Sequence, residues 1–536
     1  MISDPYVDGI ARGWRVNDAS RLDHDTEDEA DVVIVGSGAG GGISAEILAK
    51  SGLRVIVVEE GPLRSSDNFK MRESDAYPQL YQESAARKTA DKGVNILQGR
   101  CVGGSTTVNW TSSFRTPPTT LAFWQRHFGL ADYTQEQLLP WFEMVERRLS
   151  IREWDVPPNE NNDILRRGGD KLGITSHVMR RNVRGCWNLG YCGMGCPTNA
   201  KQSMLMTTIP AALELGSTVY SGLRAQRLEM EGDRVTSLMC VAMEPAGINP
   251  RSVQVRIRAR HYVLAAGSIG SPALLLRSGV PDPAQRIGKR TFLHPVVVSS
   301  AIMDSAVDGH AGAPQTIYSD HFLDSQPVDG PMGFKLEVPP MHPVLFATTL
   351  QGFGADHLAF MKQFPHAQTL LALLRDGFHE SSIGGTVRLR EDSTPVLDYP
   401  LNDFLWDGAR RALTAMAEIQ FAAGAKRVVA VHEDCSGWDN FAAAKAGIAS
   451  LALRPLSTRV VSAHVMGGCA MGTDAKHAVV DPRGKFMGLQ NLTVADGSLF
   501  PTSIGANPQQ SVYGIVARNI SALAESLTGH PASPMA

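Results

Sequence analysis

The feature that most constrains this chain is a glycine-rich turn between two apolar runs, within Asp31 to Gly61. The first run, Val32 to Val35, is continuous and largely β-branched, which predicts a fully buried strand. Gly36 to Gly41 follows at once, matches G-x-G-x-x-G, and leads into a helix predicted over Ile43 to Lys50. A second buried strand is predicted over Arg54 to Val58. The segment therefore predicts a complete βαβ unit of the dinucleotide-binding kind.

Each part of this unit has a physical role in binding a dinucleotide. Gly36 permits the tight turn, and Gly38 lets the backbone approach a pyrophosphate on the unpaired N–H groups of the helix N-terminus. Gly41 allows the helix to pack closely on the strand. The carboxylate of Glu59, 18 positions after Gly41, is predicted to accept from ribose hydroxyls. The motif alone does not separate FAD from NAD. The predicted cofactor contacts in this unit are Gly36, Ser37, Gly38, Ala39, Gly41, Glu59 and Glu60.

Composition and charge narrow the class of protein. The chain has 536 residues, 43% hydrophobic and 20% charged, so it can build the cores of about two to four domains. Its net charge of −3 and the lack of a basic stripe argue against nucleic acid as a partner. No apolar run approaches the ~18 residues of a membrane span. The polar segment 1–30 is expected to be a lead-in arm and carries no signal-peptide pattern. A cytoplasmic enzyme is therefore expected, with export alongside a signal-carrying partner left open.

A second glycine-rich turn lies in residues 98–110. Gly103 and Gly104 are adjacent and are followed by small hydroxyl residues. Because these positions lack a Cβ, the backbone here can lie against a flat or bulky group. An ordinary loop gives the same local pattern, so the sequence around the turn leaves both interpretations open.

Apolar periodicity predicts the remaining elements. A short helix is expected with Ser271 as N-cap, Pro272 at the first position and Gly279 past its end. Residues from about 295 to 455 mix short strands with helices and are interpreted as a separate α+β lobe. The other expected helices cover 83–89, 121–128, 135–150, 203–215 and 409–423, with a last one from Ser511. The expected strands cover 218–228, 235–243, 253–258, 261–267, 334–338, 385–389 and 492–495.

Several long motifs, in order along nearly the whole chain, resemble those of the glucose–methanol–choline (GMC) oxidoreductase family of FAD enzymes. These motifs are Gly36 to Gly41, Gly99 to Asn109, Gly267 to Val280, His464 to Gly472, and Asp496-Gly497-Ser498 with Asn507-Pro508. Two positions depart from the family pattern: Phe114 lies one place later than the usual aromatic residue, and Pro281 replaces a final glycine. Residues 108–117 and a cysteine-rich loop are most similar to the long-chain alcohol oxidase branch and its bacterial relatives.

The resemblance implies an α/β fold, in which a Rossmann-like FAD-binding domain is interleaved with an α+β substrate domain built on an antiparallel sheet. The implied FAD-binding parts are 1–117, 201–294 and 458–536, the last with the catalytic pair. The implied substrate parts are 118–200, which covers the flavin and holds the cysteine loop, and 295–457.

The resemblance also implies how the cofactor is held. Gly103, Gly104 and Asn109 would approach the isoalloxazine ring, and Asp496 and Gly497 would lie near the stretch from diphosphate to ribityl. Some members attach FAD through a histidine near the second glycine turn, whereas residues 90–115 contain none, so FAD is expected to be non-covalent. The remaining implied contacts are Ala225, at the place of the family's adenine contact, Ala266 and Pro508.

The implied reaction is the oxidation of an alcohol, which needs loss of a proton from oxygen and of a hydride from carbon to flavin N5. His464 is the candidate base, because an imidazole can take a proton near neutral pH. Asn507 would hydrogen-bond the substrate oxygen, which makes this the His-Asn version of a pair that is His-His elsewhere in the family. Without the resemblance, a lone histidine in a glycine-rich loop is more often structural, and His294 is interpreted as structural.

The cysteine loop has two interpretations, a metal site and a structural loop. Cys186, Cys192 and Cys196, followed by Pro197, are three of only seven cysteines, so a disulfide scaffold is not expected. Three thiolates can hold an iron–sulfur cluster, and some bacterial members of the family carry one on a cysteine loop, although the spacing differs here. A tight loop with buried thiols, or with one disulfide, is the alternative.

The sequence is compatible with three functions. The leading hypothesis is an FAD-dependent dehydrogenase or oxidase for a small-molecule alcohol, which by resemblance is lipophilic. The second is a lyase of the same fold that keeps FAD but performs no net oxidation. The third is the catalytic subunit of an electron-transfer assembly. The electron acceptor is accordingly oxygen, or an electron-carrier protein or quinone.

Overall fold

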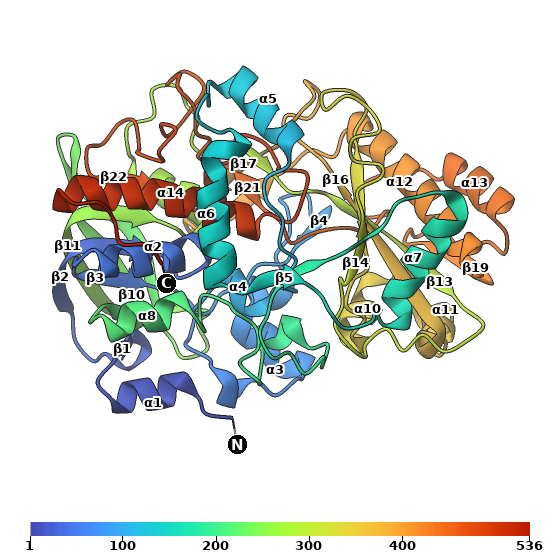
Figure 1. The fold of residues 1–536 in the computed structure, drawn as a ribbon, viewed down its shortest axis with the longest axis horizontal. Helices are drawn as coiled ribbons and strands as arrows, with labels where there is room; N and C mark the ends of the chain where they lie inside the picture. The colour runs from blue at the N-terminus through green and yellow to red at the C-terminus, as the bar shows by residue number, and fades with distance from the viewer. Residues whose placement is uncertain (1, 536) are drawn as a thin grey trace.

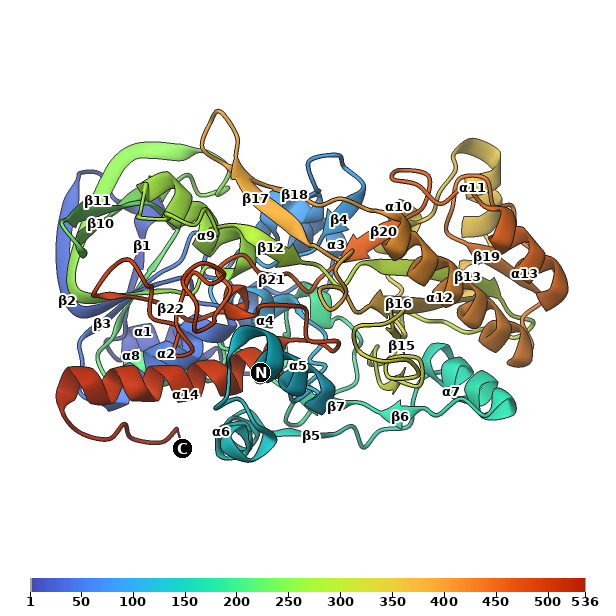
Figure 2. The same cartoon turned by 90° about the horizontal axis from the view of Figure 1, so that it is seen from above.

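Two eight-stranded sheets lie toward opposite ends of the molecule, and the helices pack around them (Figure 1). The computed structural model describes residues 2–535. The chain passes between the two sheets several times, so each is built from segments far apart in the sequence (Figure 2). Among the described residues, no helix is both long and apolar enough to cross a bilayer.

The first sheet contains the predicted βαβ unit. Its order is β1-β8-β3-β2-β11-β10-β9, and β22 also pairs with β11. The neighbouring strands β1, β8, β3, β2 and β11 are all parallel, and so is the β11–β22 pair. Strand β10 pairs antiparallel with both β11 and β9. The bounds are β1 (Arg15–Asp18), β2 (Thr26–Val35), β3 (Val55–Val58), β8 (Thr218–Ser221), β9 (Leu223–Glu231), β10 (Arg234–Met243), β11 (Pro250–Leu264) and β22 (Leu492–Val494).

Helices cover the first sheet because its central strands are apolar on both faces. Val32, Val33 and Ile34 are fully buried, as expected for strands in a parallel sheet. Helix α2 (Ala39–Lys50) lies on this sheet and packs against α14 (Gln509–Thr528) and α8 (Thr208–Glu214). In Figure 1, α14 runs beside α2 although some 460 residues separate them in the sequence.

The second sheet is antiparallel except for one pair, β20–β4. Its order is β4-β20-β13-β16-β15-β14-β6, and β19 also pairs with β13. Helix α12 (Asp403–Ala422) packs on this sheet and contacts α7 (Glu160–Leu172) and α13 (Phe441–Ser450). The bounds are β4 (Val94–Ile96), β6 (His177–Val178), β13 (Val296–Ile302), β14 (Ile317–Ser319), β15 (Phe334–Glu337), β16 (Ala367–Leu374), β19 (Arg427–Ala430) and β20 (Val460–Ser462).

Smaller elements connect the two sheets. A four-stranded sheet has the order β18-β17-β12-β21, and β5 pairs with β7. These strands are β5 (Ile151–Glu153), β7 (Arg180–Asn182), β12 (Lys289–Phe292), β17 (Gly385–Leu389), β18 (Pro395–Asp398) and β21 (Met466–Gly467). The other helices are α1 (Pro5–Ala11), α3 (Glu73–Leu80), α4 (Ser105–Val108), α5 (Pro118–Phe128), α6 (Gln135–Arg148), α9 (Gly267–Ser278), α10 (Pro343–Thr349) and α11 (Gly354–Met361).

The predicted fold class is confirmed, and most predicted elements are present, but three local predictions are wrong. The helix expected over 83–89 is absent, because Glu83, Ser84 and Ala85 all have positive φ, which is incompatible with a right-handed helix. Helix α9 begins at Gly267, so Ser271 is not its N-cap. The segment expected as an arm instead adds β1 to the first sheet. The domain limits stay a prediction, although β4 and β20 pair in the second sheet rather than in the first.

Candidate active site

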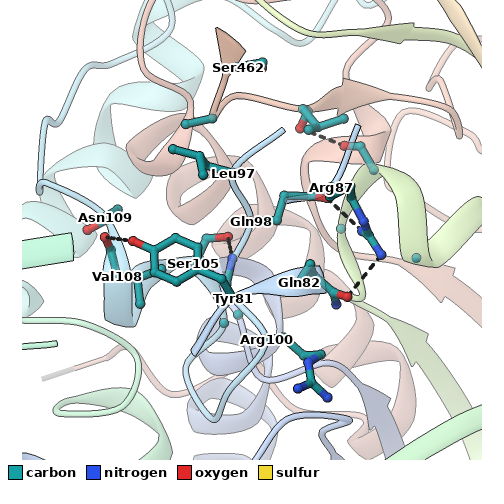
Figure 3. Close-up of a pocket in the computed structure, with 18 of the residues that line it drawn as sticks. Tyr81, Gln82, Arg87, Leu97, Gln98, Arg100, Ser105, Val108, Asn109 and Ser462 are labelled. Atoms are coloured by element: carbon teal, nitrogen blue, oxygen red, sulfur yellow. Dashed lines mark hydrogen bonds between the residues drawn. The ribbon is translucent and has the colours of Figure 1, made fainter. Parts of the chain in front are cut away.

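A cavity of about 820 Å³ runs from the first sheet to the second and contains most of the predicted site residues. Figure 3 shows one part of its wall, where residues 81–109 and Ser462 lie. Arg87 donates to Gln82 and Gln98, at 3.0 Å in each case. The Tyr81 hydroxyl donates to the carbonyl of Gly193 at 2.7 Å and lies 3.4 Å from that of Val108. These bonds fix a segment that has little regular secondary structure.

The two glycine-rich turns meet at the end of the cavity nearest α2. A Cβ on Gly104 would lie 2.8 Å from the Cα of Gly38, and Gly104 itself has a φ of +53°. The turns are also joined by Ser37, whose Oγ accepts from the Gly103 N–H at 2.9 Å. The second turn is therefore no ordinary loop, because it packs on the first and both present backbone to the cavity.

Glu59 and Glu60 end β3, and they have different partners. Glu59 Oε2 accepts from the N–H and hydroxyl of Ser37, at 3.1 and 2.6 Å, and Oε1 accepts from the Gly61 N–H at 2.8 Å. Glu59 thus braces the first glycine turn and has one acceptor position left on Oε1. Glu60 pairs with Arg224 at 3.0 Å. Both carboxylates border the cavity, where they can accept from ribose hydroxyls.

Asp496 joins the C-terminal segment to the start of α9. Its Oδ2 accepts from the Gly267 N–H at 2.8 Å and the Ser271 hydroxyl at 2.6 Å, and its Oδ1 accepts from the Ser498 N–H at 2.8 Å. Burial raises the pKa of this carboxyl, although the hydrogen bonds oppose the shift. Ser271, predicted as a cap of its own helix, instead supports Asp496.

Most of the predicted cofactor contacts border the cavity. These are Gly36, Gly38, Ala39, Glu59, Glu60, Gly104, Asn109, Ala225, Ala266, Asp496, Gly497 and Pro508. Ser37, Gly41 and Gly103 lie behind them and shape the turns. A Cβ on Gly41, for example, would lie 1.9 Å from the Gly36 carbonyl oxygen, so this glycine serves helix–strand packing.

The residues present fit a dinucleotide such as FAD. At Gly38 the nearest atom to an added Cβ is 3.8 Å away, so backbone at the start of α2 faces open cavity. Unpaired N–H groups at a helix N-terminus favour a diphosphate, and Glu59 and Glu60 would supply acceptors for ribose. Asn109 also lines the cavity, and its Nδ2 donates to Gln509 at 2.6 Å while its Oδ1 accepts from the Thr111 N–H at 3.2 Å. Gln509 was not predicted.

His464 and Asn507 come together in the cavity. His464 Nε2 lies 3.4 Å from Asn507 Nδ2, and His464 Nδ1 lies 3.4 Å from His294 Nδ1. The Gly505 N–H donates to His294 Nε2 at 3.0 Å, so a neutral His294 carries its proton on Nδ1, the nitrogen that faces His464. A neutral His464 accepts on only one ring nitrogen, so it accepts either from His294 on Nδ1 or from Asn507 on Nε2. The tautomer that accepts from Asn507 has its lone pair on Nε2, where a base needs it. Burial lowers the pKa of His464 to about 4.

A buried ion pair beneath Asn507 was missed at the sequence level. Lys335 Nζ lies 3.0 Å from Glu337 Oε1, and their side chains are 1% and 0% exposed. Lys335 also donates to Asn507 Oδ1 at 3.0 Å, and Glu337 Oε2 accepts from Asn507 Nδ2 at 3.2 Å. The i, i+2 spacing places both residues on one face of β15, while Phe334 and Leu336 enter the core of the second sheet. The sequence pattern that indicates this ion pair is a lysine and a glutamate on one face of an otherwise apolar strand.

The end of the cavity at the second sheet is apolar. Val296 pairs with Leu373, and Val298 pairs with Leu371, in the register of β13 and β16. All four border the cavity, as do Leu345 and Phe346 of α10. The cavity therefore has a polar, glycine-rich end at the first sheet and an apolar end at the second. His464 and Asn507 also line its wall.

The cysteine loop lies outside this cavity. All seven cysteines are free thiols, and within residues 2–535 no three Cys, His, Asp or Glu side chains are grouped as metal ligands. The iron–sulfur cluster stays an untested prediction. The loop has a structural link to the site: Lys201 Nζ donates to the carbonyls of Thr107, Asn109 and Cys192, at 2.8, 2.6 and 2.7 Å. Burial lowers the pKa of Lys201 to about 8.

Family models and known proteins match this chain over most of its length. Models of the GMC oxidoreductase family match residues 77–296 and 381–515, together more than half of the chain, and an FAD binding domain model matches residues 31–73. An uncharacterized GMC-type oxidoreductase of Sinorhizobium fredii is 27% identical over 95% of this chain and 96% of its own length. A long-chain-alcohol oxidase of Arabidopsis thaliana is 28% identical over 91% of this chain and 67% of its own.

Solved structures show the same fold. The crystal structure of pyridoxine 4-oxidase from Mesorbium loti has a TM-score of 0.69 and 21% identity, and the alignment covers 91% of this chain and 98% of that one. At this identity the likeness concerns the fold alone. The family models, which match more than half of the chain, show that it belongs to the GMC oxidoreductase family of FAD-dependent enzymes.

Proposed function

We propose that this protein oxidises a lipophilic alcohol to an aldehyde or ketone, with His464 as base and Asn507 as hydrogen-bond donor to the substrate oxygen. The observation that carries the proposal is the 3.4 Å approach of His464 Nε2 to Asn507 Nδ2, in a cavity whose far end is lined by Val296, Val298 and Leu371. The site thus offers a proton acceptor and a donor together, next to apolar walls.

The chain's own residues support the proton transfer. A substrate hydroxyl between the two side chains would donate to His464 Nε2 and accept from Asn507 Nδ2. As the proton passes to Nε2, the remaining Asn507 N–H stabilises the charge that develops on the oxygen. FAD, when bound non-covalently in the cavity, supplies the acceptor for the hydride that leaves the carbinol carbon. We propose oxygen as the final acceptor, because named relatives are oxidases, and hydrogen peroxide is then the second product.

The first test is a chain-length series with the purified holoenzyme. Under anaerobic conditions, 1-octanol is expected to bleach the flavin absorbance, and admission of oxygen is expected to restore it with release of peroxide. Burial of one CH₂ is worth about 0.8 kcal/mol, so kcat/KM should rise about fourfold per methylene from ethanol until the apolar end is filled. Flavin that stays oxidised with every alcohol would contradict the proposal and favour the lyase. Bleaching without peroxide would favour an electron-carrier protein or quinone as acceptor.

The reaction is expected to tolerate acid. Burial, aided by the Lys335 charge and opposed by Glu337, lowers the pKa of His464 to about 4, and burial also holds the pKa of the facing His294 well below its usual range. A base must be neutral, so kcat/KM should be constant above about pH 5 and fall about tenfold per pH unit below pH 4. The measurement is kcat/KM for 1-octanol between pH 3.5 and 8. An acid limb near the ordinary histidine value of about 6.5 would contradict the assignment.

A further inference from the structure

The amide of Asn507 has charged partners on both sides. Its Oδ1 accepts from the Lys335 ammonium at 3.0 Å, and its Nδ2 donates to the Glu337 carboxylate at 3.2 Å. A flipped amide would place its NH₂ against the ammonium and its oxygen against the carboxylate, and both contacts would be repulsive. The ion pair therefore selects one orientation of the amide. In that orientation the second N–H of Nδ2 faces His464 Nε2.

The ammonium of Lys335 is held in place without help from solvent. Its Nζ lies 3.2 Å from the ring centroid of Phe114 and 4.5 Å from that of Tyr318, and cation–π attraction of this kind strengthens when water is excluded. The approach to Glu337 Oε1 is Coulombic rather than an aligned hydrogen bond, because this oxygen accepts none. The other oxygen of Glu337 is fixed by Gln315, which donates to it at 2.8 Å.

The presence of a buried ion pair here needs an explanation. The cost of removing two charges from water can cancel their attraction, and an apolar pair of the same volume is often just as stable. Stability alone is therefore a weak reason for Lys335 and Glu337. Their contacts with Asn507 supply a stronger one. A cation on the amide oxygen draws electrons from the amide and makes the free N–H a better donor, which is the property needed where negative charge develops on a substrate oxygen.

We infer that Lys335 and Glu337 are positioning residues of the reaction, which orient and polarise the amide of Asn507 toward the substrate oxygen beside His464. The inference rests on the proposed function and deepens it. Neither residue needs to touch the reacting atoms, since both act through Asn507. Lys335 has the larger role in polarisation, because it holds the amide oxygen, whereas Glu337 fixes the N–H that the substrate does not use.

A double-mutant cycle tests whether Lys335 acts through Asn507. Lys335→Met should lower the rate of flavin reduction by 1-octanol at least about tenfold in the otherwise unchanged protein. In an Asn507→Ala background the same substitution should change the rate less than about threefold, because the amide that it serves is gone. Additive effects in the two backgrounds would overturn the inference. If Lys335→Met does not fold, Lys335→Met/Glu337→Gln, which buries no unpaired charge, takes its place in the cycle.

A titration that needs no turnover provides the second readout. The imidazole signals of His464, identified by their loss in His464→Gln, are followed by ¹⁵N NMR against pH. Because Lys335 lowers and Glu337 raises the pKa of His464, Lys335→Met should move the titration upward and Glu337→Gln should not. An unchanged titration in Lys335→Met would overturn the inference. If the unsubstituted protein shows no alcohol oxidation, the proposed function fails, whereas this titration still decides whether the ion pair acts on the His464–Asn507 site.

Arg148→Met is the matched control. Arg148 Nε pairs at 2.9 Å with Glu46, whose side chain is 2% exposed, so this substitution also leaves a buried carboxylate without its nearest cation. Neither residue borders the cavity. Arg148→Met is expected to lower the melting temperature while the His464 titration and the rate of flavin reduction stay unchanged. A loss of rate comparable to that of Lys335→Met would overturn the inference, since it would reduce the effect to general destabilisation.

Discussion

Alanine at position 104 is expected to leave the purified protein largely free of FAD. Gly104 has a φ of +53°, and its new Cβ would lie 2.8 Å from the Cα of Gly38, so the two glycine turns must separate at the place where we propose that they hold the cofactor. Overpacking of this kind costs about 1–3 kcal/mol, equivalent to roughly 5- to 150-fold weaker binding. The measurement is the ratio of flavin to protein absorbance after gel filtration, together with the dissociation constant for added FAD.

Gly173→Ala separates this steric effect from backbone strain. Gly173 also has a positive φ, +69°, but nothing lies within 4 Å of the added Cβ. Both substitutions place alanine at a positive φ, whereas only the change at Gly104 pushes the turns apart. The Gly173 variant should therefore keep its FAD. If Gly104→Ala retains stoichiometric flavin, the contact between the turns does not hold the cofactor.

Replacing His464 by glutamine should slow flavin reduction by 1-octanol about a thousandfold, since a positioned general base contributes roughly 10²–10⁴. Glutamine keeps a polar side chain of similar reach but cannot take the proton. FAD content should not change, because the proposed role of His464 is proton transfer and not cofactor binding. The measurement is anaerobic stopped-flow absorbance at saturating alcohol.

His477→Gln is the control for this substitution. The side chain of His477 is 68% exposed and pairs with Asp474 on the surface, so the rate should stay within about twofold of the unsubstituted protein. A comparable loss in both variants would indicate a general effect of removing a histidine. A fall of less than about tenfold in His464→Gln would mean that another group accepts the proton.

The parts of the fold that the sequence predicted well are those set by neighbouring residues. The strand at Val32 to Val35, the glycine turn and helix α2 follow from local periodicity and from backbone sterics at Gly36. The errors arose where residues far apart in the sequence determine the local structure. Helix α9 starts at Gly267 because Asp496, over 200 positions away, accepts the Gly267 N–H, and local capping rules at Ser271 could not include that partner.

The candidate site divides in the same way. His464 and Asn507 were found through motifs and resemblance, and the structure brings them together. Lys335 and Glu337 belong to no motif, and their importance comes from contacts with Asn507, 170 or more residues away. The partner of Asn109 is likewise Gln509, at a separation of 400 residues. Such pairs depend on the tertiary fold, which local periodicity does not encode.

The position of β22 has a consequence for how the enzyme is made. Strand β11 pairs with β2 on one side and with β22 on the other, where Tyr262 faces Leu492. The first sheet therefore stays incomplete during synthesis until residue 494 has left the ribosome, and Asn507 emerges later still. Contacts this distant in sequence form slowly, and the unfinished strand edge is open to aggregation meanwhile. We therefore expect flavin loading to follow the synthesis of this C-terminal segment.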